Sequence, residues 1–558
     1  MRFTHHGPQY DIKQQASNFF PDKWSRASAP QLYLPGCSTE GATCPAANRV
    51  AIDPRTGASL GAGSSFAIGT IVPNTGVITN GVIQAGQGIA KENYVEDALV
   101  FGPRLGAAYD LSGTQNIVVR GSFGVFYDRP QGDAIFGQIG NPPTGQGSTV
   151  IYSTLQNVAA GTSTLQPPPV LLIHEYNAEI GAATQWNAGI QMTLPFYSSL
   201  DVSYVGTHNY NSIAFGSIST PAGQNPLDLN APDIGAAYLP QNQDRTAASS
   251  TVPGAMAVAT ELLRPYRGLG PIVLTSPRFH TNYDSIQMSV NRRFRNGWQG
   301  GLNWTLGLRF EGNTLSPQHL VHNADGTIGL ASYQEDNDRL LSNVGLRRHL
   351  IKGNFVWELP TIESATGAMQ VIRAIANDWQ LSGVFTAGSG APYDATYTYQ
   401  TAGANVNLTG SPNYTARIRA TGDIGSGCSS DQYAQFNALA FAGPTYFSTG
   451  NESGANLLTG CWDHTTDLTI ARNIRLGGSR SLQFRFDAFN VFNSVVINAR
   501  QNQVQLNNPS DPTTIRNNQY NADGTLNATR LTPATAGFGA ATAAQPLRSM
   551  QMQIRFMF

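Results

Sequence analysis

The 558-residue sequence predicts an all-β chain, and three observations lead to this prediction. Apolar and polar residues alternate over stretches of roughly eight to twelve residues, which is typical of a strand with one apolar and one polar face. The links between these stretches are alternately very short and very long. No run of about eighteen apolar residues occurs, so a transmembrane helix is excluded. Any membrane-spanning part must therefore be built from strands.

The alternating stretches follow one another as hairpins, and one strand remains at the end of the chain. Turn residues such as SGTQ (112–115) and Asn296-Gly297 separate the two strands of a hairpin. In chain order, the predicted strands are 105–111 with 117–127, 186–194 with 200–204, 286–293 with 302–308, 349–360 with 379–390, 467–476 with 481–493, and finally 549–558.

The connections decide between a soluble β-sandwich and a membrane barrel. Short turns fall near residues 112, 197, 297, 369 and 479, and long segments cover 131–182, 212–280, 315–344, 398–462 and 498–545. A sandwich has no reason to place all its long loops at one end, whereas outer-membrane barrels have short periplasmic turns and long extracellular loops. The sequence therefore predicts an antiparallel transmembrane β-barrel, located in the outer membrane of a Gram-negative bacterium and in contact with its lipid.

The alternation also predicts which side chains meet lipid and which face the lumen. In the last strand, the residues from Met550 to Phe558 alternate between large apolar side chains and Gln551, Gln553 and Arg555. Aromatic residues near strand ends are expected at the membrane interfaces: Tyr109, Trp186, Trp298, Trp357 and Trp379. The charged residues expected to line the lumen, or to form salt-bridge ladders or contacts with a plug there, are Arg104, Arg120, Asp201, Arg293, Arg309, Arg485, Asp487 and Arg555.

The strand count suggests that the barrel is larger than this sequence. About eleven long strands are predicted, whereas bacterial single-chain barrels have an even number and leave no free edge in lipid. We expect residues 1–100 to be an extracellular loop region before the first recognisable strand, and residues 101–558 to be the C-terminal part of the barrel. The first residues contain no secretory signal, so the chain is either cytosolic or a fragment; the strand pattern favours the fragment.

Four cysteines lie at positions that favour disulfides over a metal site. Cys37 and Cys44 are close in sequence, as one candidate pair, and Cys428 and Cys461 form the other. No CxxC motif and no histidine pair at ligand spacing accompanies them, so a zinc site is not expected. Two loop disulfides would indicate an oxidising compartment. Free buried thiols remain an alternative.

No pattern of residues points to catalysis, a cofactor or nucleic acid. The glycine-rich stretch 61–69 lacks the Lys-Ser/Thr ending of a phosphate-binding loop, and the nine histidines share no spacing. Charged residues make up only 12% of the chain and the net charge is −1, so no basic surface for nucleic acid is expected. We expect the protein not to be an enzyme.

Several stretches resemble the barrel of TonB-dependent receptors of the Oar-like type, which contain a carboxypeptidase-regulatory domain. These are FGPRLGAAYDLSGTQNIVVRGSFGVFYDRP, QWNAGIQMTLPFYSSLDVSYVGT, NYDSIQMSVNRRFRNGWQGGLNWTLG, DWQLSGVFTAGSGAPY, FNALAF and LQFRFDAFNVFN. Each stretch alone is weak evidence for the resemblance, but their order and spacing together are specific for this family. The resemblance implies a 22-stranded outer-membrane barrel, of which this sequence would be about half. It also implies that Phe556 and Phe558 belong to the C-terminal signal for barrel assembly.

The resemblance implies a receptor that takes up a solute with energy from the TonB complex. The signal peptide, N-terminal domain, TonB box and plug of such receptors are not recognisable in this sequence, so contact with TonB would need those missing N-terminal regions. The long loops, rich in Asn, Gln, Ser, Thr and Gly, suit recognition of a glycan, a peptide or a siderophore, but do not indicate which. Adhesion, protein secretion and a passive porin-like channel are the alternative functions.

Overall fold

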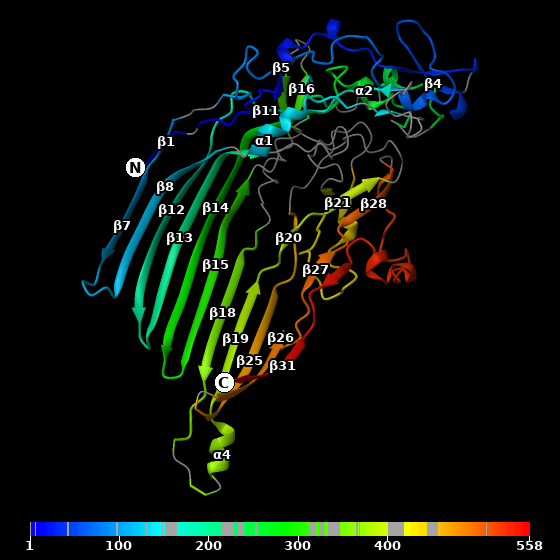
Figure 1. Ribbon diagram of the computed structural model, residues 1–558. Helices are drawn as coiled ribbons and strands as arrows, with labels where there is room; N and C mark the ends of the chain where they lie inside the picture. The colour runs from blue at the N-terminus through cyan, green and yellow to red at the C-terminus, as the bar shows by residue number, and fades with distance from the viewer. Residues whose placement is uncertain are drawn as a thin grey trace.

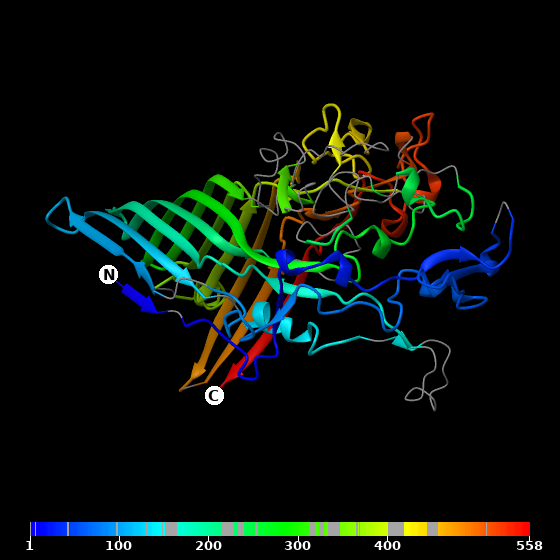
Figure 2. The same ribbon diagram turned by 90° about the horizontal axis from the view of Figure 1, so that it is seen from above.

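A computed structural model of the chain shows eleven antiparallel strands in one curved, open sheet (Figures 1 and 2). Each strand is hydrogen-bonded to the next one along this path, so the predicted hairpins are confirmed. The strands of the path are β7 (Arg104–Asp110), β8 (Ile117–Asp128), β12 (Gly181–Leu194), β13 (Ser198–Ala214), β14 (Ile272–Arg295), β15 (Trp298–Gly312), β18 (His349–Glu358), β19 (Trp379–Gly388), β25 (Asp463–Gly477), β26 (Arg480–Phe489) and β31 (Ser549–Met557).

The structure describes residues 2–558 except 6, 42–43, 96–98, 130–131, 148, 151–163, 215–227, 233–235, 237–238, 251–254, 313–317, 323–327, 333–345, 364–365, 368, 400–417, 444–455, 479 and 509–510. Parts of the predicted long loops and of the turn near residue 479 therefore lie outside the described residues. Helices within the described residues are short: α1 (Gly132–Phe136), α2 (Thr260–Leu263) and α4 (Met369–Ala376). None of them is both long and apolar enough to span a bilayer.

Register places apolar side chains on one face of the sheet and polar side chains on the other. Between β26 and β31, Phe486 lies opposite Met552, whereas Arg485 lies opposite Gln553. Met552 is 72% exposed although it is apolar, because nothing in the described part of the chain covers it. We call the face that carries Met552 the outer face and the face that carries Gln553 the inner wall. This alternation is the one predicted for the last strand.

Short turns join the strands at one end of the sheet, which we call the turn end. In the turn between β7 and β8, the carboxylate of Asp110 accepts hydrogen bonds from the backbone N–H groups of Ser112 and Gln115 at 3.0 and 2.7 Å. Between β14 and β15, Asn296 and Gly297 both have positive φ, as a tight hairpin turn requires. The connection predicted as a turn near residue 369 is different, because it contains helix α4.

Strands at the opposite end, the loop end, run further than the alternation predicts. β13 has 17 residues and β14 has 24. The extra residues of β14 lie above the apolar stretch, where Ile272 to Thr275 pair in parallel with β11 (Leu171–His174). Pairing with β11 thus continues β14 beyond its apolar outer face. The alternating stretches of about eight to twelve residues therefore underestimate the lengths of β13 and β14.

The loops gather at the loop end and contain buried clusters of their own (Figure 1). The first loop core consists of Phe19, Leu171, Ile173, Leu229, Tyr266, Leu269 and Ile272. The second loop core consists of Ala395, Tyr397, Tyr399, Ile418, Phe436, Phe441, Leu458, Val504, Leu506 and Phe538. In the second core, β21 (Thr396–Tyr399) pairs in parallel with β28 (Gln503–Asn508), which also pairs with β29 (Asp511–Ile515).

Small two-stranded sheets complete the loop end and one edge of the sheet. Near the β7 edge, β1 (Arg2–His5) pairs with β6 (Leu99–Gly102), which directly precedes β7. The remaining small strands are β2 (Ser17–Phe19), β3 (Leu34–Cys37), β4 (Arg49–Ile52), β5 (Val82–Gln84), β9 (Thr149–Val150), β10 (Thr164–Leu165), β16 (Gln318–His322), β17 (Ile328–Ser332), β20 (Pro392–Tyr393), β22 (Arg419–Ala420), β23 (Phe441–Ala442), β24 (Leu458–Thr459), β27 (Ile497–Arg500) and β30 (Ala541–Ala544).

Both candidate cysteine pairs form disulfides in the structure. Cys37 is bonded to Cys44 in the loop that joins β3 and β4, and Cys428 is bonded to Cys461 close to the second loop core. The second disulfide closes a sequence separation of 33 residues. Cys461 lies just before the start of β25 (Asp463), so this disulfide lies at the loop end of the sheet. The glycine-rich stretch 61–69 forms a short 3₁₀ helix, Ser64–Ala67, within the same region as Cys37.

Within the described residues, the sheet does not close on itself. Its two edges are β7 and β31, and each has a strand of the path on one side only. Because neighbouring strands of the path alternate in direction and eleven strands lie along it, β7 and β31 run in the same direction. They could therefore not pair with each other in an antiparallel barrel.

Candidate functional site: the polar inner wall

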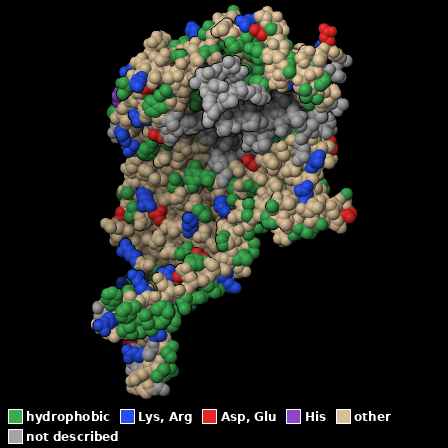
Figure 3. Space-filling view, turned by 45° about the vertical axis from the view of Figure 1, so that its right-hand side comes forward, with side chains coloured by type: hydrophobic (Ala, Val, Ile, Leu, Met, Phe, Trp, Pro, Cys, Tyr) green, Lys and Arg blue, Asp and Glu red, His purple; other side chains and the backbone are tan. Residues whose placement is uncertain are grey.

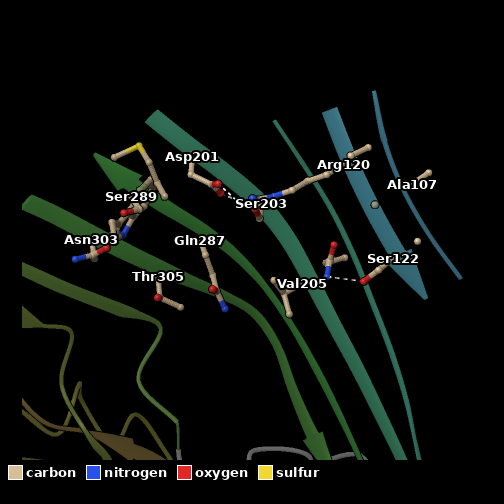
Figure 4. A pocket seen from close by; sticks show the side chains of 16 residues that line it. Ala107, Arg120, Ser122, Asp201, Ser203, Val205, Gln287, Ser289, Asn303 and Thr305 are labelled. Carbon is tan, nitrogen blue, oxygen red and sulfur yellow. Dashed lines mark hydrogen bonds and ion pairs between the residues drawn. The ribbon is translucent and has the colours of Figure 1, made fainter. Parts of the chain in front are cut away.

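The candidate site is a hollow of about 730 Å³ on the inner wall, between β7 and β15 (Figure 4). Figure 4 shows that its side chains come from neighbouring strands and are mostly small and uncharged. Its polar residues occupy alternate positions of each strand, so the strand period of two residues brings them onto one surface. The polar residues of this surface are Arg120, Ser122, Asn187, Asp201, Ser203, Gln287, Ser289, Asn303 and Thr305.

One charged pair lies in this hollow. The guanidinium of Arg120 donates a hydrogen bond to the carboxylate of Asp201, which also accepts one from Ser203 Oγ at 2.8 Å. Arg120 also donates to Gln191 Oε1 at 3.4 Å. Both charged side chains remain partly exposed, at 46% and 27%. The two predicted lumen residues thus form an ion pair and leave little net charge in the hollow.

Uncharged side chains form similar hydrogen bonds, both between strands and along one strand. Asn187 Nδ2 donates to Ser122 Oγ at 2.8 Å across β12 and β8. Asn291 Nδ2 donates to Ser289 Oγ at 2.7 Å along β14. Such groups offer donors and acceptors to a passing polar solute without holding it by a strong charge. Prediction from sequence concentrated on the charged residues and missed these amides and hydroxyls, although their alternation with apolar residues was visible.

A second charged cluster lies on the inner wall near the β31 edge. Asp487 is only 3% exposed and accepts hydrogen bonds from Arg485 Nε at 2.8 Å, Thr469 Oγ1 at 2.5 Å and Gln551 Nε2 at 3.1 Å. These bonds connect β25, β26 and β31. The arrangement matches the alternative that predicted lumen charges form local salt bridges. Arg555 lies further along β31, opposite Gln483.

The structure places Arg309 on the outer face, unlike the prediction. A β-bulge between β14 and β15 skips Leu308, so that Gly307 lies opposite Ser285 and Arg309 opposite Asp284. The carboxylate of Asp284 lies 4.0 Å from Arg309 and accepts a hydrogen bond from Tyr204, an outer-face residue of β13. Strict alternation would have kept Arg309 on the inner wall, and the extra residue reverses its direction.

Most of the remaining predicted residues lie near the ends of the strands. Arg104 stacks over the ring of Phe126 at 4.5 Å, and Arg293 lies beside the bulge before the β14–β15 turn. Trp298 and Trp357 face each other across β15 and β18 at the turn end, where Tyr109 and Trp379 also lie. Trp186 lies within β12 instead, with its ring close to Gly206 of β13.

Arginine side chains stack on aromatic rings at the turn end, which the sequence analysis did not predict. The guanidinium of Arg292 lies 3.9 Å from the ring centre of Trp298, and that of Arg472 lies 5.5 Å from that of Trp379. A cation over an aromatic ring is weakly attractive at exposed sites and stronger where water is excluded. This end of the sheet therefore combines aromatic rings with positive charge, as membrane interfaces do.

A smaller hollow of about 360 Å³ lies where the inner wall meets the loop end. It is lined by Phe126, Asn211 and Glu179 among others, and Asn211 Nδ2 donates to Glu179 Oε2 at 2.7 Å. His174 of β11, which is 1% exposed, also lines it. Burial lowers the pKa of His174 below its ordinary value, so the side chain is neutral at pH 7.

No set of three or more His, Cys, Asp or Glu side chains in the described part of the chain could hold a metal ion. In the larger hollow, polar groups such as Asn187 and Ser122 bridge neighbouring strands. The geometry suits contact with a polar solute.

Comparison with known families decides the class of protein. The family model of the outer membrane beta barrel domain matches residues 1–551. The chain belongs to this family. It is accordingly an outer-membrane protein, and its outer face meets lipid. The comparison with curated proteins gave no significant match.

Solved structures of outer-membrane receptors resemble this barrel domain at low sequence identity. A mutant ferric enterobactin receptor (PfeA) from Pseudomonas aeruginosa is 11% identical, with a TM-score of 0.35, and the alignment covers 82% of this chain and 40% of that one. The siderophore receptor PirA from Acinetobacter baumannii is 10% identical, with a TM-score of 0.37 and coverage of 82% and 41%. The outer membrane transporter YddB from Escherichia coli is 10% identical, with a TM-score of 0.37 and coverage of 75% and 39%. The chain thus spans about 40% of the length of these receptors.

Proposed function

We propose that the chain is part of a TonB-dependent outer-membrane receptor that binds a solute at its loop end and passes it along the inner wall. The observation that supports this most is the continuous, mostly uncharged polar surface from Asn303 to Ser122, which lies below a folded layer of loops. A surface of amides and hydroxyls can exchange water for solute hydrogen bonds many times along a path. The resemblance of the barrel sequence to TonB-dependent receptors supports the same function.

The orientation of the domain follows from its connections. Outer-membrane barrels have short turns on the periplasmic side and long loops on the outside. We therefore propose that the loop end, including both disulfides, is extracellular and that the turn end is periplasmic. Residues 1–100 would then belong to the extracellular layer, and Phe556 and Phe558 would lie on the periplasmic side, where barrel assembly signals act.

The two open edges support a larger barrel. Each unpaired backbone group in lipid costs several kcal/mol of stability, so the edge strands β7 and β31 need partners. Because both edge strands run from the loop end to the turn end, both partners must run the opposite way. An odd number of additional strands satisfies this condition, and a second copy of this sheet in the same orientation does not. We propose that further strands of a longer polypeptide complete the barrel, which agrees with a 22-stranded receptor.

An uptake assay tests the proposal. Cells that produce the complete polypeptide are given panels of labelled ferric siderophores, glycans and peptides, with and without a functional TonB complex. We expect accumulation of one class of solute, and its loss when the energising complex is absent. Uptake that is indifferent to this complex overturns the proposal and favours a passive channel. Adhesion or secretion is indicated if no solute accumulates but the loops bind cells or exported protein.

Variants of the inner wall show whether the solute passes along it. The pair Ser122→Leu and Asn187→Leu replaces a polar bridge with bulky apolar groups, and we expect severalfold slower accumulation at an unchanged level of protein in the membrane. The matched control is Val119→Leu, which changes an outer-face residue of the same strand, β8. Equal uptake by both variants would exclude the hollow from the path.

A further inference from the structure

Helix α4 (Met369–Ala376) projects from the turn end between β18 and β19 (Figure 1). Its apolar residues Val371, Ile372 and Ile375 follow the spacing that puts side chains on one side of a helix. Gln370 and Arg373 lie on the opposite side, where they line a hollow with Thr361 to Glu363 of the same connection. The polar side of the helix thus turns toward its own connection, and the apolar side turns away from it.

The apolar side of α4 is uncovered by the described part of the chain. Val371 is 62% exposed, Ile372 50% and Ile375 61%. A helix of two turns is unstable in water by itself, because few hydrogen bonds offset the cost of forming its first turn. It requires a surface against which the apolar residues can pack.

The connection is tied firmly to the end of the sheet. Trp379 Nε1, at the start of β19, donates a hydrogen bond to the backbone carbonyl of Ile375 at 2.7 Å. Asn377 exchanges hydrogen bonds with the backbone of Ile362 at 2.9 and 3.1 Å, and its own carbonyl accepts one from Arg472 Nε at 3.2 Å. The helix therefore has a fixed attachment, with its apolar side next to an aromatic residue of the strand wall.

Trp379 makes this apolar side continuous with the lipid-facing surface. On β19 it belongs to the outer-face row with Leu381, which lies opposite Trp357 of β18 and Ile470 of β25. Figure 3 shows apolar side chains gathered around the neck of the projection. Arg472, stacked over Trp379, and Arg292, stacked over Trp298, add positive charge at the same end of the sheet. Such charges suit the phosphate groups of a phospholipid surface.

We infer that α4 is an interfacial helix, whose apolar side lies in the phospholipid surface of the membrane at the turn end. Because that end is periplasmic in the orientation proposed above, the surface is the inner leaflet of the outer membrane. The bilayer covers Val371, Ile372 and Ile375, and the polar side with Arg373 stays in water. The helix thus anchors the rim of the sheet beside Trp379, independently of which solute the receptor takes up.

Fluorescence quenching in proteoliposomes tests this placement. Single cysteines replace Ile372 or Ile375 on the apolar side, and Gln370 or Arg373 on the polar side, in the complete protein reconstituted with phosphatidylethanolamine and phosphatidylglycerol. Each cysteine carries an environment-sensitive fluorophore. Spin-labelled lipids quench fluorophores at the bilayer, and iodide quenches those in water. Met552→Cys on the outer face and Gly113→Cys in a short turn provide the lipid and water references.

We expect labels at Ile372 and Ile375 to be quenched severalfold more by lipid than by iodide, and labels at Gln370 and Arg373 to show the reverse. An added Ile375→Glu should move the Ile372 label toward iodide quenching. Equal iodide quenching of all four positions overturns the inference, because the helix then lies in water. Protection of Ile372 and Ile375 from both quenchers also overturns it and indicates a protein partner.

Discussion

The strand sheet and the loop layer of this barrel domain bury their apolar residues in different ways. The sheet leaves Met552 and its neighbours exposed on the outer face, where lipid covers them. The loop layer buries residues such as Leu171 and Ile272 almost completely, in cores made by the chain itself. The first region therefore depends on the membrane for its stability, and the second should keep or lose its structure independently of the membrane.

The largest difference in stability between the two regions should follow from breaking a buried ion pair in the loop layer. Arg264 Nη1 lies 3.1 Å from Asp228 Oδ2, and both side chains are almost fully buried at 1% and 2% exposure. Asp228 also accepts a hydrogen bond from the backbone N–H of Ile272 at 2.8 Å. Asp228→Asn leaves the Arg264 charge unpaired, and we expect it to destabilise the first loop core by about 3–5 kcal/mol. Protease should then cut the loops while the strands stay in the membrane.

The matched control is Asp22→Asn, whose partner Lys23 forms an exposed pair at 3.1 Å. Exposed pairs contribute about 0–1 kcal/mol, so cleavage should stay at the level of the unchanged protein. Loss of the strands from the membrane in Asp228→Asn would contradict the independence of the two regions.

The next largest effect is expected on the outer face of the sheet. Met552→Arg places a charge on the lipid side near the middle of β31 and should cost about 2–4 kcal/mol. Phe556→Arg, closer to the turn end, should cost less. Gln553→Arg is the control, because Gln553 faces the inner wall opposite Arg485. The amount of each variant in purified outer membranes measures the effect, and equal amounts for the three would show that the facing is wrong.

The two regions also differ in how far the sequence predicted them. Alternation predicted the strand order and the facing of β31, because each strand buries or exposes residues with a period of two. It failed at Leu308, where one extra residue moves Arg309 to the outer face. The loop cores were not predictable in this way, because Phe19, Leu171 and Ile272 meet across long sequence separations with no local period.

The candidate site was likewise predicted from the sequence only in part. Its charged members Arg120 and Asp201 were expected on the inner wall, and the register brings them together. Their pairing with each other required knowledge of which strands are neighbours. Helix α4 was missed because the segment was interpreted as one turn of a hairpin, although the spacing of Val371, Ile372 and Ile375 was visible. Local patterns were therefore informative wherever a feature was contained in one element.

Alkaline pH should affect the loop layer before the sheet. Burial raises the pKa of Tyr266 in the first loop core to about 12, compared with 10 for an ordinary tyrosine. The neutral form is favoured in the folded core, so its stabilising contribution is complete below pH 10 and is lost as the pH rises through 12. At about 1.4 kcal/mol per pKa unit, the loss is at most about 3 kcal/mol.

Protease cleavage of the loops between about pH 9 and 12 should report this loss. Tyr266→Phe should remove this part of the pH dependence, whereas Tyr10→Phe, at an exposed position, should leave it unchanged. An identical alkaline profile in Tyr266→Phe would show that another group is responsible.

Acid should act on the loop layer through His174 of β11, next in sequence to Ile173 of the first loop core, with the smallest effect. The ring lies 5.1 Å from that of Tyr94; Nδ1–H donates to the backbone carbonyl of Glu175 at 2.8 Å. Burial lowers the pKa of His174, and the nearby Glu175 opposes this shift only in part. The folded loop layer therefore favours the neutral ring, and its stability should fall as the pH drops below about 6.5, where the unfolded segment takes up the proton first.

His174→Gln removes the titrating group but keeps a polar side chain of similar size. Loop cleavage at about pH 5 relative to about pH 7.5 should therefore increase in the unchanged protein and stay nearly constant in His174→Gln. His464→Gln, at the start of β25 and far along the chain from the first loop core, serves as the control and should behave like the unchanged protein. If acid instead reduced loop cleavage, a charged His174 would be stabilised in the folded loop layer. Among the described residues, Glu175 is the only acidic group that acts on the pKa of His174.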